Sequence, residues 1–309
     1  MKGLILFMDH LAEFLFSLIA SIALISSLFI FHKFWAKTAK TYWVRIIVGS
    51  WLLIGEIWFL VTKDIFVFKF ADGTLNPMFM YWELCAILTV TAIILMVVPS
   101  KLNLDLFLPF AILAPIIVIV VPTADTKSWG FDNFRYWNYY FGHLGLMFAY
   151  LYTYLFGYTK AKLSWQSIRR SAAFAIFLAT FLMVWNMAYS PNNPLEPVPA
   201  GEDLNKWWGP NYLYKFLMYY LGMGRFSLLN QYFLMIFVLM PLILTLCWTM
   251  LYFLRPMYAN CGTQRLKFDI HENILGFRTI FTKANFKQTS KSLLNKITTS
   301  GKKPPLDKN

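Results

Sequence analysis

Charged residues are scarce in this chain, and their scarcity decides its class. Asp, Glu, Lys and Arg make up 14% of the 309 residues, whereas apolar residues make up 58% and the mean hydropathy is +0.52. Several stretches of about 20 residues carry almost no charge, the length that crosses roughly 30 Å of hydrocarbon. This composition excludes a soluble globular protein. It predicts an all-α polytopic membrane helical bundle over residues 1–254, followed by a basic tail over residues 255–309.

Several chemical motifs are also missing. The sequence contains no HExxH, no CxxC and no glycine-rich phosphate loop, so the metalloprotease, dithiol and nucleotide-binding signatures are absent. The first apolar run has no small-residue cleavage site, so we expect no cleavable signal. Asp9, His10 and Glu13 come nearest to a metal trio, but polar residues at the edge of a span are more commonly just solvated. We therefore expect neither a metal nor a cofactor.

Cysteine is rare as well. Cys85 and Cys247 fall in predicted spans and Cys261 falls in the tail, so the three residues do not suggest a disulfide framework. A buried free cysteine is commonly an inert apolar residue, and Cys247 fits that description.

The apolar runs predict about seven transmembrane helices. They lie at about 10–31, 43–62, 78–99, 103–122, 135–157, 168–189 and 228–254. Pro99 and Pro122 end two of these runs and Pro77 begins another, which is where proline is tolerated.

The basic residues lie mainly on one side of these spans. Of the 28 Lys and Arg residues, twenty lie in the first, third and fifth linkers and in the tail after Leu254. Basic loops favour the cytoplasm, so we expect the N-terminus outside and the C-terminus in the cytoplasm of a multi-pass cell-membrane protein. The tail can lie on an anionic leaflet, and we expect no nucleic-acid binding.

The long outer segment, residues 190–226, begins with prolines and continues with closely spaced tryptophans and tyrosines. Such aromatics suit the headgroup layer, so we expect an interfacial or re-entrant helix over the mouth of the bundle. An ordinary aromatic belt is the alternative.

Polar residues inside the spans gather in the outer half of the bundle. Glu83 and Cys85 lie in the third span, and Glu56, His143 and Asn186 lie in the second, fifth and sixth. Ionisable groups are costly in a membrane and are commonly functional. The inner half reads as almost purely apolar. A one-sided polar pocket suits lipid headgroups or esters better than a path for transport.

A thiol and an imidazole stand out in this pocket. Cys85 and His143 each lie about two helical turns into a span, so they enter the bilayer to a similar depth of roughly 11 Å. A cysteine beside a base can perform acyl transfer, with His143 moving the proton. Glu56 could orient the imidazole or pair with Arg135. Arg135 and Asn186 are candidate donors to an oxyanion.

Three segments resemble one known family. FRYWNYYFGHLG (134–145) resembles the Phe-Arg-aromatic run before a histidine in the YwaF-like integral membrane proteins. YWELC (81–85) resembles an earlier motif of that family that ends in Leu-Cys, and NMAYSPNNPLEP (186–197) resembles its asparagine- and proline-containing loop. Together the resemblance covers about residues 40–254.

That family is related to membrane acyltransferases that move long acyl chains onto phospholipids and, more distantly, to androgen-induced hydrolases of fatty-acid esters. The resemblance implies Cys85 as nucleophile and His143 as base. We therefore expect an acyltransferase or transacylase that acts on phospholipid or lysophospholipid through a Cys thioester. An ester hydrolase using the same pair and a lipid or small-solute transporter are the alternatives. The sequence leaves the oligomeric state open.

Overall fold

The computed structural model describes residues 10–39, 41–59, 61, 83–120, 130–156, 164–209, 213–214, 217 and 221–254. The tail and one end of several predicted spans (residues 60, 62, 78–82, 121–122 and 157) lie outside these residues. The elements are α2 (Leu11–Ile30), α3 (His32–Thr38), α4 (Trp43–Phe59), α5 (Leu84–Val97), α6 (Lys101–Val120), α7 (Phe134–Leu155), α8 (Trp165–Ala188), α9 (Leu204–Trp208), α11 (Leu228–Leu234), the π-helix η4 (Met235–Leu239) and α12 (Met240–Leu254). The described part contains helices and no strands, which confirms the all-α prediction.

Four helices are long and apolar enough to cross a membrane. They are α2, α6, α8 and the run Leu228–Leu251, which combines α11, η4 and most of α12. The pair α3 and α4, bent by 86°, makes a fifth if it is counted as one span. The chain is therefore a membrane protein with several candidate spans. Because α5 is shorter and α7 is rich in polar aromatics, the count of seven spans stays a prediction. The orientation of the termini also stays a prediction.

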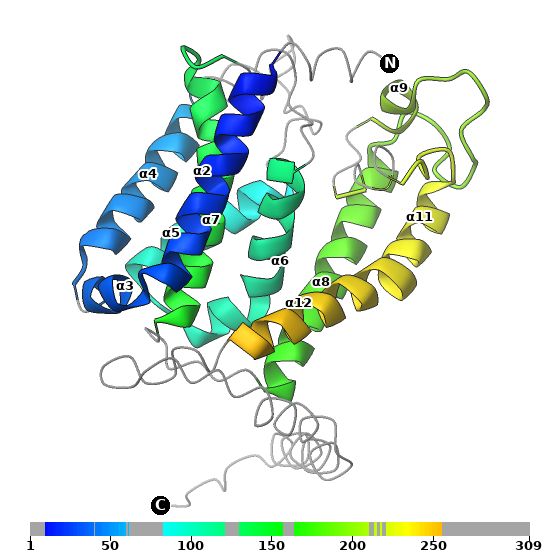
Figure 1. Ribbon diagram of the computed structural model, residues 1–309. Coiled ribbons are helices and arrows are strands. Elements are labelled where there is room, and N and C mark those ends of the chain that lie inside the picture. The colour runs from blue at the N-terminus through cyan, green and yellow to red at the C-terminus, as the bar shows by residue number, and fades with distance from the viewer. Residues whose placement is uncertain are drawn as a thin grey trace, which may run out of the picture.

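Two groups of helices make up the bundle, and α6 joins them. Figure 1 shows α2, α4, α5 and α7 on one side of α6 and α8 and α11 on the other, while α12 runs from α11 toward the lower end of α6. The second half of α7 lies at the centre of the first group, since every residue from Leu146 to Leu155 is buried. A helix that is apolar and buried on all sides belongs in a core.

The helix termini fall at two ends of the bundle. One, here called the α3 end, holds α3, the start of α4, the ends of α5, α7 and α12, and the starts of α6 and α8; the other is called the α9 end. The side chain of Arg45 fixes the α3 end by donating to Met96 O at 2.7 Å and Val97 O at 2.6 Å. A guanidinium at the last turn of α5 complements the negative end of that helix dipole.

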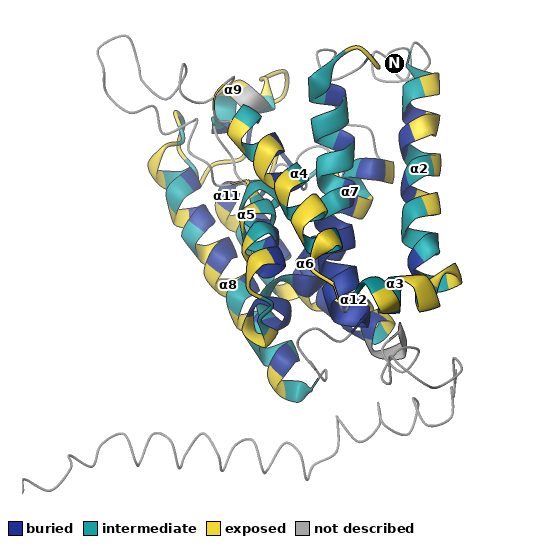
Figure 2. Cartoon of the chain, turned by 90° about the vertical axis from the view of Figure 1, so that its left-hand side faces the viewer, coloured by how far each residue is buried: buried dark blue, intermediate teal, exposed yellow. Residues whose placement is uncertain are grey.

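Apolar residues cover the outside of the bundle. Figure 2 shows exposed residues along the outer faces of α4 and α8. Among them Ile47 is 65% exposed, Phe177 66% and Val184 62%. Contiguous apolar surface of this extent marks an interaction site in a soluble protein and suits contact with lipid in a membrane protein.

Proline shapes one span. Pro241 is the second residue after the π-helix η4 and lies in the first turn of α12. Since proline cannot donate a backbone hydrogen bond to the carbonyl four residues earlier, the wider turn of η4 absorbs the break in the ladder.

The outer segment folds onto the bundle, although only part of it is described. Within it, α9 is a helix of five residues. Trp208 and Tyr214 are fully buried, and the Tyr214 hydroxyl donates to Ala179 O at 2.9 Å, well inside α8. These two aromatics therefore anchor the segment against the bundle, and its place at the membrane interface stays a prediction.

Candidate functional site

Cys85 lies in the first turn of α5. The helix begins at Leu84, and Glu83 before it has extended backbone angles of φ −67° and ψ 135°. The prediction that Cys85 lies two turns into a helix is therefore wrong. Its thiol is half-buried and sits at a helix N-terminus, where the first backbone N–H groups have no acceptor within the helix.

His143 lies ten residues into α7 and is half-buried. Its Nδ1 forms a hydrogen bond with the backbone carbonyl of Tyr139, one turn earlier, and the Tyr139 ring lies 5.1 Å from the imidazole ring, centroid to centroid. A carbonyl can only accept, so Nδ1 carries the proton and the lone pair is on Nε2. This is the tautomer that a general base requires.

Helices α5 and α7 pack against each other and run in the same direction. Their register is set by the Tyr150 hydroxyl, which lies 2.9 Å from Thr91 Oγ1. Cys85 precedes Thr91 by six residues, about 9 Å along the axis, and His143 precedes Tyr150 by seven, about 10 Å. The thiol and the imidazole therefore lie at similar levels of two adjoining helices.

One carboxylate links the two residues. Glu83 is exposed at the start of α5 and interacts electrostatically with both Cys85 and His143.

Glu56 lies near the α9 end of α4 and is half-buried. Its neighbour Gly55 lies close to α7: a Cβ built there would collide with Asn138 Oδ1, and Asn138 Nδ2 donates to Gly55 O at 3.3 Å. The orienting hydrogen bond of His143 comes from the backbone of Tyr139. The role of Glu56 in orienting the imidazole stays a prediction.

Arg135 and Asn186 lie farther from the thiol and imidazole. Arg135 is in the first turn of α7, eight residues or about 12 Å before His143, with its backbone N–H capped by Asn133 Oδ1 at 2.9 Å. Asn186 is fully buried on α8, a helix whose main contacts are with α6, α11 and α12. The supporting roles predicted for both residues are therefore left as predictions.

A polar network at the α3 end was not predicted from the sequence. Asn103 Nδ2 donates to Thr91 O at 2.9 Å, and the Tyr150 hydroxyl donates to Asn103 Oδ1 at 2.7 Å, so the network joins α5, α6 and α7. The expectation of an almost purely apolar inner half is wrong. Asn103 begins the fourth predicted span, and its polar amide in an apolar run was the feature that could have indicated this network.

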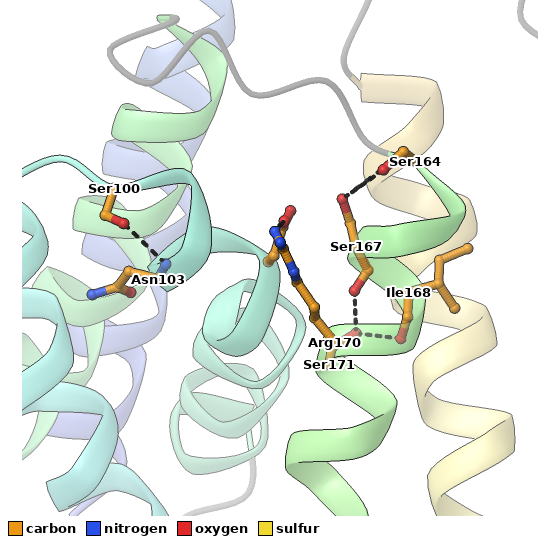
Figure 3. Close-up of polar contacts among 8 residues, drawn as sticks. Ser100, Asn103, Ser164, Ser167, Ile168, Arg170 and Ser171 are labelled. Carbon is orange, nitrogen blue, oxygen red and sulfur yellow. Dashed lines mark hydrogen bonds and ion pairs between the residues drawn. The ribbon is translucent and has the colours of Figure 1, made fainter. Parts of the chain in front are cut away.

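An ion pair between a buried carboxylate and a half-buried arginine lies beside this network. Arg170 on α8 reaches toward α6, as Figure 3 shows, and its Nη1 lies 2.6 Å from Asp105 Oδ2. Asp105 is 1% exposed. Nearby, Trp248 Nε1 on α12 donates to Ser171 Oγ at 2.8 Å. Asp105 is the third residue of a predicted span, and a carboxylate at such a position could have indicated a buried ion pair.

The predicted outer-edge trio of Asp9, His10 and Glu13 lies partly outside the described residues. His10 Nδ1 is 3.6 Å from Glu13 Oε1. Over the ranges that the structure describes, no three or more His, Cys, Asp or Glu side chains gather where they could hold a metal.

The sequence model of one protein family matches residues 7–252, which include Cys85, His143 and the polar network. The chain belongs to the TMEM164 family. Membership of the TMEM164 family supports a transmembrane protein, in agreement with the apolar helices. No curated protein and no solved structure matches the chain.

Proposed function

We propose that this member of the TMEM164 family is a membrane acyltransferase. Its substrates are phospholipids and lysophospholipids, with Cys85 as nucleophile and His143 as general base. The relation to the YwaF-like proteins and their acyltransferase relatives, suggested by the sequence motifs, is part of this proposal.

In the first half-reaction, His143 Nε2 takes the proton of the Cys85 thiol as the sulfur attacks the ester carbonyl of a phospholipid. The carbonyl π bond opens and the oxygen carries the negative charge. When the carbonyl re-forms, the ester C–O bond breaks and the imidazolium returns its proton to the departing lysophospholipid oxygen. The acyl chain remains on Cys85 as a thioester.

The second half-reaction reverses these roles. Nε2 takes a proton from the hydroxyl of an acceptor lysophospholipid, whose oxygen attacks the thioester. The C–S bond breaks, and the proton returns to the sulfur. No net proton, electron or water is consumed, so the cycle is an acyl exchange.

Developing negative charge on the carbonyl oxygen needs donors. The backbone N–H groups of Leu84, Cys85 and Ala86 belong to the first turn of α5 and lack acceptors within the helix. They are the nearest candidates along the chain to the thiol. Arg135 and Asn186 remain candidates that a lipid headgroup could also contact.

The observation that carries the proposal is the packing of α5 against α7, with the contact between Tyr150 and Thr91 bringing Cys85 and His143 to similar levels of the two helices. The Tyr139 carbonyl, which leaves Nε2 of His143 as the base, supports it. Both side chains are half-buried, so a substrate could reach them.

Two alternatives share the scaffold. In an ester hydrolase, water replaces the acceptor lipid in the second half-reaction. In a transporter, the polar groups at the α3 end would form part of a path for the substrate. These groups instead contact one another: Asn103 forms hydrogen bonds with Thr91 and Tyr150, and Asp105 pairs with Arg170. Satisfied groups of this kind join helices and do not form an open path.

The test is acyl exchange between a phospholipid with a labelled acyl chain and an unlabelled lysophospholipid, using purified protein. We expect Cys85→Ala and His143→Ala to abolish exchange. Two matched controls should retain it. Cys247→Ala removes the buried cysteine of α12, and His32→Ala removes a histidine whose Nδ1 also meets a backbone carbonyl, Phe29 O at 3.2 Å.

Retained exchange in Cys85→Ala would remove the nucleophile from the proposal. Free fatty acid released without an acceptor would favour the hydrolase. Flux of lipid or solute in proteoliposomes that survives both substitutions would favour the transporter.

A further inference from the structure

Three buried tyrosines in the second half of α7 connect this helix to different parts of the bundle. The Tyr152 hydroxyl lies 3.1 Å from Thr38 Oγ1 of α3, and the Tyr154 hydroxyl donates to Leu251 O of α12 at 2.8 Å. The Tyr150 hydroxyl reaches α5 and α6. Tyr150 therefore bonds the helix that carries the proposed nucleophile.

Tyr150 closes a network of three side chains across three helices. Its hydroxyl lies 2.9 Å from Thr91 Oγ1 on α5 and donates to Asn103 Oδ1 on α6 at 2.7 Å. Asn103 Nδ2 in turn donates to Thr91 O at 2.9 Å, so a side chain of α6 also holds the backbone of α5. Tyr150 is fully buried and Asn103 is 9% exposed. A buried hydrogen-bonding group that loses its partner costs free energy, so the network favours one register of the three helices.

That register decides the relative level of the proposed catalytic pair. Cys85 stands six residues before Thr91 and His143 stands seven before Tyr150, so their levels differ by about 1.5 Å when Thr91 and Tyr150 meet. A slip of α5 by one helical turn would change this difference by about 5 Å. Proton transfer requires hydrogen-bond distance, and a misplacement of about 1 Å can cost on the order of 100-fold in rate.

The faces of the two helices agree with this arrangement. His143 and Tyr150 are seven residues apart and share one face of α7, and the Tyr150 contact turns that face toward α5. Cys85 and Ala92 are likewise seven residues apart on α5, and Ala92 is fully buried. Both members of the pair therefore lie on the inner faces of their helices.

We infer that Tyr150 is a positioning residue for the proposed acyl transfer. Its hydroxyl, together with Asn103 and Thr91, holds α5 at the register on α7 that brings the thiol of Cys85 level with the imidazole of His143. The network lies about 10 Å from the imidazole along α7 and acts on the reaction through this register. The inference rests on the proposed function, because it gives the network a role in that reaction.

Cross-linking tests the register without catalysis. In a chain whose other two cysteines are replaced by alanine, His143→Cys supplies a thiol that a short bifunctional methanethiosulfonate can join to Cys85. We expect Tyr150→Phe, which keeps the buried ring, to slow this cross-link several-fold. Tyr152→Phe removes a similar hydroxyl contact, to α3, and should leave the rate unchanged.

Kinetics test the consequence for the reaction. In the otherwise unchanged chain, Tyr150→Phe should lower kcat for acyl exchange about tenfold with KM unchanged, because the network aligns the reacting groups and does not bind substrate. Thr91→Val should do the same, whereas Thr91→Ser keeps the hydroxyl and should retain most of the rate. Tyr152→Phe and Tyr154→Phe are matched controls from the same helix and should also retain it.

Three results would overturn the inference. They are an absent cross-link in the chain that retains Tyr150, an unchanged cross-linking rate in Tyr150→Phe, and equal losses of kcat in Tyr150→Phe and Tyr152→Phe. A chain without any acyl exchange would overturn the proposed function instead, and the cross-linking rates would still report whether Tyr150 sets the register.

Discussion

At the scale of single residues, two polar side chains in the described part of the protein are held by specific partners. The Nδ1 of His143 meets the carbonyl of Tyr139, and the carboxylate of Asp105 meets the guanidinium of Arg170. An unpaired charge in a low-dielectric interior is far more costly than a paired one. Replacing one member of such a pair should therefore lower the stability of the fold, because it leaves the other member without its partner.

The Asp105–Arg170 pair gives a prediction of stability. Arg170→Leu leaves the carboxylate of Asp105 buried without its cation, and we expect it to cost about 3 kcal/mol of folding free energy. Arg169→Leu on the same turn of α8 is the matched control and should cost much less. Reversible unfolding in mixed detergent micelles measures both.

The double variant separates the pair from its surroundings. Asp105→Leu combined with Arg170→Leu removes both charges, so we expect it to recover most of the loss. Equal costs for Arg169→Leu and Arg170→Leu, or a double variant as unstable as the sum of the single ones, would contradict the assignment.

At the scale of elements, the sequence predicted helix positions better than helix boundaries. A helix occurs at each of the seven predicted positions, because long apolar runs mark spans clearly. Helix α3 was missed, since seven residues between two apolar runs read as a basic linker. The predicted start of α5 was too early. Residues 78–83 are mostly apolar, like the helix that follows them, so nothing in the sequence marked a boundary at Leu84.

The candidate site was only partly predictable for the same reason. The residue types of Cys85 and His143 are visible in the sequence, but the position of the thiol in a first turn is not. The backbone acceptor at Tyr139 carries no signal in its residue type, since every residue has a carbonyl. Asp105 and Asn103 were visible polar residues, and only the packing of α6 against α7 and α8 gave them partners.

The close approach of α4 and α7 gives a prediction at this scale. Gly55→Ala places a methyl group on Asn138 Oδ1, so the amide must swing away and lose its hydrogen bond to Gly55 O. We expect a cost of about 1 kcal/mol. In an Asn138→Ala background the obstacle is gone, and Gly55→Ala should then cost much less. Additive effects of the two changes in the same unfolding assay would show that the helices do not meet there.

At the scale of the whole molecule, the described basic residues Lys37, Lys101 and Arg169 lie at the α3 end, and α9 of the outer segment lies at the other end. The positive-inside rule predicts that the α3 end is cytoplasmic. Lys101 begins α6 at that end, and Glu202 lies just before α9 at the other; both are exposed.

Cysteine labelling tests this orientation. In a chain with Cys85, Cys247 and Cys261 replaced by alanine, we expect a membrane-impermeant maleimide to label Glu202→Cys on intact cells. Lys101→Cys should react only after the cells are permeabilised. Labelling of Lys101→Cys on intact cells would reverse the orientation.

The most direct measurement of the central claim is a search for the thioester itself. The purified protein is incubated with a defined phospholipid in the absence of an acceptor, and its peptides are analysed by mass spectrometry. The acyl chain should be attached to Cys85, should leave on treatment with hydroxylamine, and should be missing from His143→Gln. An unmodified Cys85 in protein that still exchanges acyl chains would contradict the account.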